Sequence, residues 1–314
     1  MSCTQTSHMS TPSPMPRVPA WRGMALIALA AVAWGTGGAV AAVLYRTSGL
    51  GPIAVSYWRF LIGAVALAVY VSLRRTRRVP RDPARRYRRL LAVLATGAGL
   101  AVYQSAFYLS IAHSGLAVAT VVTLGAGPIL IAIGARAFLA ERLGHAGAAA
   151  ITLALSGLVA LSLDGGATGP NPALGLACAL LSALGYAVVT LVGRTADAAG
   201  DPFRTSLSGF LVGGVVLTPF ALAEGVLPTA GGLGVTIGWL LYLGVVASAL
   251  AYGLFFAGLA HVSATTAAIV TLLEPVAAAI LAVGFLGEHL SPAVLTGMLL
   301  LVGAVAVLTR PARR

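Results

Sequence analysis

Ten long apolar segments constrain this sequence more than any other feature, because each approaches the length of a membrane-crossing helix. A helix needs about 20 predominantly apolar residues to span a bilayer. Only 9% of the residues are charged, whereas soluble domains carry about 25%. The sequence therefore predicts an all-α polytopic membrane protein with ten transmembrane helices. The predicted spans are 23–45, 52–73, 90–112, 115–139, 146–163, 174–193, 205–224, 233–256, 264–286 and 292–309.

The placement of arginine predicts how these helices are oriented. All 20 basic residues are arginine, and nine of them lie in RRTRRVPRDPARRYRR, residues 74–89, between two apolar runs. Positive charge concentrates in the cytoplasmic loops of membrane proteins, and an even number of spans returns the chain to its starting side. We therefore expect a multi-pass plasma-membrane protein with both termini in the cytoplasm. No soluble basic domain accompanies the arginines, so we expect no nucleic-acid partner.

The sequence offers few groups for a cofactor, a metal ion or a disulfide. Cys3 lies in the Ser/Thr/Pro-rich start of the chain, and Cys178 lies inside an apolar run. Nothing resembles a phosphate-binding loop of the GxxxxGK[ST] type. We expect no cofactor and no metal, and we expect the lipid bilayer as a partner. Residues 1–22 are predicted to form a disordered cytoplasmic tail, and residues 310–314 a second, short one.

Two parts of the sequence resemble each other. Residues 107–143 are similar to residues 255–290, and after a one-residue slip Pro128 matches Pro275. Further matches keep nearly the same spacing, which makes a chance likeness of two apolar segments a poor explanation. They pair Pro52 with Pro202, Phe60 with Phe210, Gly63 with Gly213 and Glu141 with Glu288.

The repeating unit is five spans long, with a first copy over 23–163 and a second over 174–309. Because five is odd, the second copy enters the membrane upside down relative to the first. Inverted repeats with interrupted helices near the midplane are typical of secondary transporters. We expect Pro275 to interrupt span nine, and Pro128, preceded by Gly127, to interrupt span four at the corresponding place.

Three stretches carry a resemblance to a known family. They are AVAWGTGGAVAAVLY in span one, YWRFLIGA in span two and VTLLEPVAAAILAVGFLGEHLSP in span nine. These are similar to EamA-type members of the drug/metabolite transporter superfamily, and the resemblance covers nearly the whole chain after its first residues. It implies transport of a small molecule, commonly the export of amino acids or other metabolites. The first copy departs from the family's pattern, with Gly127 where the second copy has Glu274.

Glu274 is the charged residue that is hardest to explain inside an apolar run. Placing a charge at the centre of a membrane helix costs roughly 2.5–3.5 kcal/mol on insertion scales. Pro275 follows directly and would free the carbonyl group of Thr271. One interpretation is a cavity-lining carboxylate that meets the substrate or a coupling proton, with Thr271 beside it. The other is a structural ion pair or a protonated, hydrogen-bonded carboxyl group.

Arg59 lies about seven residues into span two, which is deep for a side chain that reaches the membrane surface. We interpret it as a partner of Glu274 or of an anionic substrate group, the alternative being an extended side chain that still reaches the interface. Several other side chains inside the spans combine an apolar body with a hydrogen-bonding edge. Such residues suit a pocket for an amphiphilic solute, although they equally suit helix packing. They are Trp34, Tyr103, Gln104, Tyr186 and Tyr252.

Glu141 and Glu288 occupy corresponding turns after spans four and nine. A carboxylate at the start of a helix is stabilised by the N–H groups and the dipole there. We interpret both as caps of the helices that follow or as contacts at an interface.

The pattern favours a secondary transporter that moves a small metabolite by alternating access, driven by a proton gradient or by the gradient of the substrate itself. A flippase for a lipid-linked solute is an alternative within the same superfamily. An intramembrane enzyme is disfavoured, because Glu274 and Arg59 supply no nucleophile, base and orienting group together. We therefore expect no catalytic residue, and the sequence gives no indication of oligomeric state.

Overall fold

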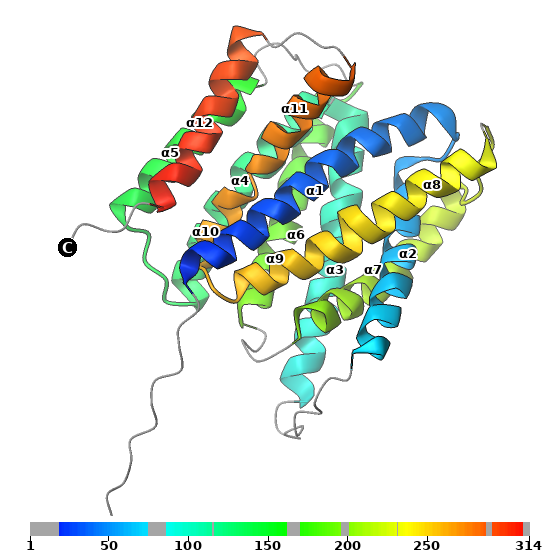
Figure 1. Ribbon diagram of the computed structural model, residues 1–314, viewed down its shortest axis with the longest axis horizontal. Helices are drawn as coiled ribbons and strands as arrows, with labels where there is room; N and C mark the ends of the chain where they lie inside the picture. Colours follow the sequence, from blue (N-terminus) through cyan, green and yellow to red (C-terminus); the bar gives the residue numbers. More distant parts are fainter. Residues whose placement is uncertain are drawn as a thin grey trace, which may run out of the picture.

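The described part of the chain is built entirely from helices (Figure 1). The computed structural model describes residues 19–74, 86–114, 116–161, 170–195, 201–230, 232–286 and 291–309. No strand occurs within these ranges. The helices are α1 (Ala20–Thr47), α2 (Pro52–Leu73), α3 (Arg86–Ser114), α4 (Leu116–Phe138), α5 (His145–Leu161), α6 (Pro172–Thr195), α7 (Pro202–Glu224), α8 (Leu233–Gly244), the π-helix η2 (Val245–Leu250), α9 (Ala251–Leu259), α10 (Ala264–Val270), α11 (Leu273–Leu286) and α12 (Pro292–Thr309).

Helical structure occupies every one of the predicted apolar segments. Seven helical stretches among the described residues are long and apolar enough to cross a membrane. Three shorter apolar stretches cover 145–160, 264–278 and 295–308. The predicted all-α membrane class is thus confirmed, while ten spans in two inverted repeats stay a prediction.

Two helices begin earlier than the apolar runs indicated. Helix α1 begins at Ala20, so the predicted tail over 1–22 is wrong for its last three residues. Helix α3 begins at Arg86 because four residues of the arginine-rich stretch continue the helix beyond its apolar part. Residues 1–18 and 310–314 lie outside the described residues.

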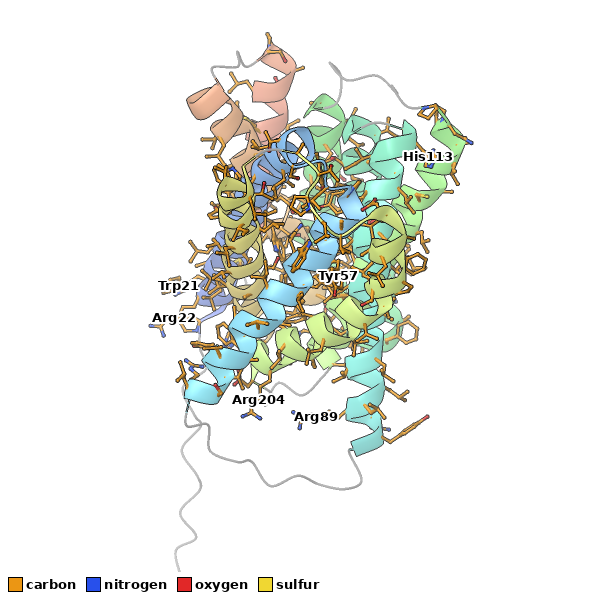
Figure 2. All side chains as sticks on the ribbon, turned by 90° about the vertical axis from the view of Figure 1, so that its right-hand side faces the viewer. Trp21, Arg22, Tyr57, Arg89, His113 and Arg204 are labelled. Atoms are coloured by element: carbon orange, nitrogen blue, oxygen red, sulfur yellow. The ribbon has the colours of Figure 1, made fainter. Side chains whose placement is uncertain are left out.

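Charged and apolar side chains divide the surface along the long direction of the bundle. Figure 2 shows Arg22, Arg89 and Arg204 toward one end, and His113 toward the other. These arginines lie at the starts of α1, α3 and α7. Between the ends, exposed leucine and valine side chains cover the helices, as on Leu61, Val65, Leu211 and Val215. An apolar belt flanked by charged ends fits a protein surrounded by lipid.

Helices α2 and α7 pack through a reciprocal contact. The Phe60 and Phe210 rings stack with centroids 5.1 Å apart and planes 11° apart. A Cβ atom on Gly63 would lie 2.8 Å from the Phe210 ring, and one on Gly213 would lie 2.7 Å from the Phe60 ring. Each ring therefore occupies the space left by a glycine of the opposite helix. The two phenylalanines are matched positions of the internal repeat, and so are the two glycines.

Helix α1 lies between α11 and α9 and packs against both (Figure 1). A Cβ atom on Gly35 would lie 2.6 Å from the carbonyl oxygen of Glu274 and 2.9 Å from the Cβ atom of Ala277. Small residues permit such close approach of backbones in membrane proteins. Gly35 therefore fixes α1 against the first turn of α11.

We expect Gly35→Ala to lower the free energy of unfolding by about 1–3 kcal/mol, because the added methyl group forces α1 and α11 apart. Thermal unfolding of the detergent-purified protein measures this loss. Gly38→Ala is the matched control on the same helix, since nothing lies within 4 Å of a Cβ atom there. That control should be neutral or slightly stabilising. Equal effects of the two substitutions would contradict the close crossing.

Candidate functional site

The helical chain breaks between α10 and α11, at Thr271 and Leu272. The backbone N–H groups of Leu272 and Glu274 donate to carbonyl groups three residues earlier, at 3.1 and 3.0 Å. In a regular α-helix each N–H group donates to the carbonyl group four residues earlier. Pro275 therefore lies in the first turn of α11, where its missing N–H group is tolerated. The same turn holds Glu274, and the N-terminal end of a helix favours a negative charge.

Helix α4 does not share this break. It runs from Leu116 to Phe138 as one helix with Pro128 inside it. The predicted interruption at Gly127 and Pro128 is therefore not formed, because a proline inside a membrane helix removes one backbone hydrogen bond without ending the helix. Gly127 and Pro128 are both buried.

Tyr186 of α6 connects α4 to the break. Its hydroxyl group lies 2.8 Å from Thr271 Oγ1. Thr271 uses its one hydroxyl hydrogen on the carbonyl group of Ala268, at 2.7 Å, so Tyr186 donates to Thr271. The Tyr186 ring lies against Gly127, where a Cβ atom would meet it at 3.1 Å. The ring thus fills the place in the first half that corresponds to the Glu274 side chain in the second.

Arg59 of α2 is buried, with 8% of its surface exposed. Its Nε donates to Ser248 Oγ at 3.2 Å, and its Nη1 donates to the Tyr108 hydroxyl group at 3.2 Å. Ser248 belongs to the π-helix η2, a distortion that is frequent at functional sites. Both partners are neutral, and among the described residues no carboxylate lies within 4.0 Å of the guanidinium group.

Glu274 is part-buried and interacts electrostatically with Arg59. Tyr103, Tyr186 and Tyr252 are also among its electrostatic neighbours. In the part of the chain that the structure describes, no hydrogen bond or ion pair reaches its carboxylate. The hypothesis of a direct Arg59–Glu274 pair is therefore wrong for this conformation. The two residues are electrostatic neighbours, but they form no ion pair.

Aromatic side chains complete the surroundings of the two charges. Trp34 lies edge-on to Tyr252 with ring centroids 5.0 Å apart, and Tyr103 lies 5.5 Å from Tyr186. Trp34 Nε1 and Gln104 Nε2 are buried and have no hydrogen-bond partner among the described residues. Buried donors are almost always paired in folded proteins, so these two unpaired N–H groups are unusual.

The structure brings most of the predicted site residues together, with one exception. Gln104 is buried on α3 next to Tyr103, but within the described chain no hydrogen bond joins its Nε2 atom to the other candidates. The sequence analysis did not select Tyr108 and Ser248, which hold Arg59. A signal for Tyr108 existed, because the matched position in the second repeat is the apolar Phe256. Ser248 gave none, since nothing in VVASAL indicates a π-helix.

A separate hollow lies on the outer surface between α4 and α6. It encloses about 340 Å³ and is lined by Ala126, Ile129, Leu130, Leu180 and Leu184. Its lining contains only apolar side chains, so it offers nothing to hold a polar solute. Its exposed leucines place it on the surface that lipid would cover.

The sequence profile of the EamA-like transporter family matches the chain at residues 21–163 and again at residues 173–310. The chain belongs to this family. It is 31% identical to the uncharacterized transporter YwfM of Bacillus subtilis over 92% of this chain and 94% of the relative. It is 30% identical to the uncharacterized protein PA1977 of Pseudomonas aeruginosa over 94% of this chain and 96% of the relative. The family and the first of these names indicate a membrane transporter.

The fold also has a counterpart among solved structures. One crystal structure superposes with a TM-score of 0.76, over 91% of this chain and 97% of the other. The sequences of this EamA family member and of that chain are 21% identical, so the likeness concerns the fold alone.

We expect Tyr186→Phe to lower the free energy of unfolding by about 1 kcal/mol, because it removes one hydrogen bond at the break. Thr271→Val should cost about 1–3 kcal/mol, since it also leaves the Ala268 carbonyl group without its hydroxyl donor. Thermal unfolding of both variants and of the double variant measures the coupling between the two hydroxyl groups. A double variant that loses the full sum of the two single effects would show that the hydroxyl groups do not interact.

Proposed function

We propose that this EamA family member is a secondary transporter that moves a small metabolite, an amino acid or a related solute, across the plasma membrane by alternating access. Export is the proposed direction. The proposed architecture is ten spans in two inverted repeats, 23–163 and 174–309, with both termini in the cytoplasm. The arginines at one end of the bundle and the two matches to the family profile support this arrangement.

One observation carries the proposal: Arg59 and Glu274 lie near each other inside the bundle, yet neither is ion-paired within the described chain. Ionisable side chains inside membrane-spanning segments are costly, and they commonly mark substrate or proton pathways. Two groups of opposite charge that are not paired with each other suit a solute that carries both signs. In this arrangement Arg59 binds the carboxylate of the solute, and Glu274 binds its ammonium group or a coupling proton.

The remaining site residues take roles that follow from their chemistry. Trp34, Tyr103 and Tyr252 supply flat apolar surfaces with polar edges, which suit the uncharged part of a small solute. Thr271 and Pro275 lie at the break between α10 and α11. Discontinuous helices of this kind form the substrate sites of several transporter folds.

The reciprocal packing of α2 and α7 supports the inverted repeat. Matched residues of the two copies contact each other there, Phe60 with Phe210 and each ring with the other copy's glycine. Contacts between matched residues arise when two copies are related by a pseudo-two-fold axis. An axis in the membrane plane is what alternating access between two equivalent halves requires.

We expect an amino acid or a related zwitterion to raise the unfolding temperature of the purified protein. A ligand at 100 times its dissociation constant adds about 2.7 kcal/mol to stability. The screen covers amino acids, amines, nucleosides, sugars and common drugs. For any amino acid that stabilises, the matched probes are its decarboxylated amine and its N-acetylated acid, which each keep one of the two charges.

Wild-type protein should prefer the zwitterion to both singly charged probes. Glu274→Gln should remove the preference for the ammonium group. Arg59→Gln should remove the preference for the carboxylate. Arg204→Gln, at the end of the bundle, serves as the control and should change neither preference. Uptake into inside-out vesicles then tests export. A hit that keeps its affinity in both site variants would move these charges out of the binding site. Stabilisation by lipid-linked solutes alone would favour the flippase.

A further inference from the structure

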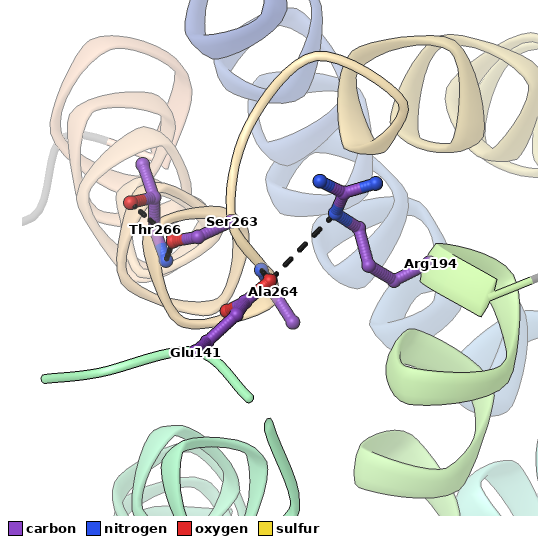
Figure 3. Close-up of polar contacts among 5 residues, drawn as sticks. All are labelled: Glu141, Arg194, Ser263, Ala264 and Thr266. Carbon is purple, nitrogen blue, oxygen red and sulfur yellow. Dashed lines mark hydrogen bonds and ion pairs between the residues drawn. The ribbon is translucent and has the colours of Figure 1, made fainter. Parts of the chain in front are cut away.

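Glu141 joins the first half of the molecule, residues 20–161, to the second, residues 172–309 (Figure 3). Its Oε1 accepts a hydrogen bond from the backbone N–H group of Ala264 at 3.3 Å. The same oxygen lies 3.7 Å from Nε of Arg194. Glu141 thus contacts the beginning of α10 and the end of α6. It is therefore an interface contact across the halves and does not cap α5, the helix that follows it.

The backbone around Glu141 is held in an uncommon conformation. Ala140 has φ at 53°, the one positive value among the described non-glycine residues. Such a conformation persists only where the surrounding structure determines it. On the other side of the contact, Ser263 Oγ accepts from the Thr266 N–H group at 3.0 Å and caps α10 within its own half (Figure 3). Glu141 adds a contact to α10 that comes from the opposite half.

Glu224 makes the reverse connection. It ends α7 in the second half, and its Oε2 accepts from the backbone N–H group of Ala54 in the first turn of α2, at 2.6 Å. Gly51 leaves the room that this carboxylate occupies, since a Cβ atom there would overlap it. Each half therefore supplies one carboxylate that binds the start of a helix in the other.

The two contacts lie at opposite ends of the bundle. Helix α7 spans 23 residues from Pro202 to Glu224, which corresponds to about 34 Å. Arg194 lies near the end of α6, and only a short connection separates α6 from the start of α7. Arg204 marks that starting end in Figure 2, together with Arg22 and Arg89. The Glu141 contact is thus at the arginine-rich end, and the Glu224 contact is at the other.

Each contact also binds a helix that is connected to one charged residue of the candidate site. Glu141 contacts α10, which leads to Glu274, and Glu224 contacts α2, which carries Arg59. Helix α10 has seven residues, so Ala264 is connected to the break before Glu274 by a single short helix. Ala54 and Arg59 are five residues apart on α2. A displacement of the start of α2 is therefore transmitted along about 8 Å of helix to Arg59, and a displacement of the start of α10 along about 10 Å of helix to the break before Glu274.

We propose that Glu141 and Glu224 are positioning residues that hold the two ends of the transporter shut. Opening one end separates the halves there and must break that end's contact, while the contact at the other end stays. The released helix then carries Glu274 or Arg59 with it, which changes the spacing of the two site charges. This inference rests on the proposed transport function, because only alternating access requires the two ends to open in turn.

Side-specific cysteine labelling tests the proposal on the full chain in vesicles. Cys3→Ser and Cys178→Ser provide the background, and Thr36→Cys places a reporter on α1 one residue from Gly35. A membrane-impermeant maleimide is added to right-side-out and to inside-out vesicles. Glu141→Gln should raise labelling from its own end about fivefold, since a charged acceptor becomes a neutral one. Glu224→Gln should raise labelling from the opposite end to the same extent.

Asp201→Asn is the matched control. Asp201 accepts from Phe203 N–H at 3.0 Å and pairs with Arg204 at 3.8 Å, so it caps its own helix without joining the halves. It should leave labelling unchanged from both ends. Arg194→Gln, which keeps the Glu141 carboxylate on Ala264, should give a smaller shift of the same sign and covers the case that Glu141→Gln fails to fold.

Labelling that rises equally from both ends, rises in Asp201→Asn or does not change in the two glutamate variants would overturn the proposal. Thermal unfolding of the same samples separates a general loss of stability, which raises labelling from both ends. The proposed function fails independently if no solute is transported while labelling still follows the expected sides. In that case the two carboxylate contacts still determine which end of the molecule opens, although the molecule carries out no transport.

Discussion

Inside a bilayer no water is available to form hydrogen bonds with a polar group. Each polar group in the bundle must therefore find a hydrogen-bond partner elsewhere in the chain. The break after α10 depends on this constraint. Thr271 satisfies the Ala268 carbonyl group and in turn accepts from Tyr186 of α6. Arg59 is held in the same way by hydroxyl groups from α3 and η2. A polar centre is stable here because several helices contribute one group each.

Close packing of backbones provides the frame that makes this sharing possible. Gly35 lets α1 touch the first turn of α11, and the exchange of rings and glycines locks α2 to α7. Such contacts leave little freedom within each packed pair. Changes of shape are therefore expected where regular hydrogen bonding is already lost, at the break before Glu274 and at η2. Rigid pairs joined at irregular points suit a molecule that moves by tilting whole helices.

Much of this arrangement could be predicted from the sequence, because a charge in an apolar run has few explanations. Glu274 and Arg59 were both selected as candidates in this way, and they are electrostatic neighbours in the structure. The predicted direct pair between them does not form. Spacing along a helix does not tell how far apart two helices hold their side chains. The interruption at Pro128 was also wrong, because a proline alone does not decide whether a helix bends or ends. The role of Ser248 could not be predicted from the sequence, because the π-helix that contains it depends on tertiary packing.

The filling of the Gly127 position by the Tyr186 ring has a kinetic consequence. Two identical halves related by a two-fold axis would give a carrier whose two open states are equivalent and equally populated at rest. Here only the second half brings a carboxylate to the centre, and the first brings an aromatic ring held against a glycine. The two open states of such a carrier differ in energy. Under the proposed alternating access, its resting population is biased toward one side of the membrane, and its maximal rates in the two directions are unequal even when the driving gradients are the same.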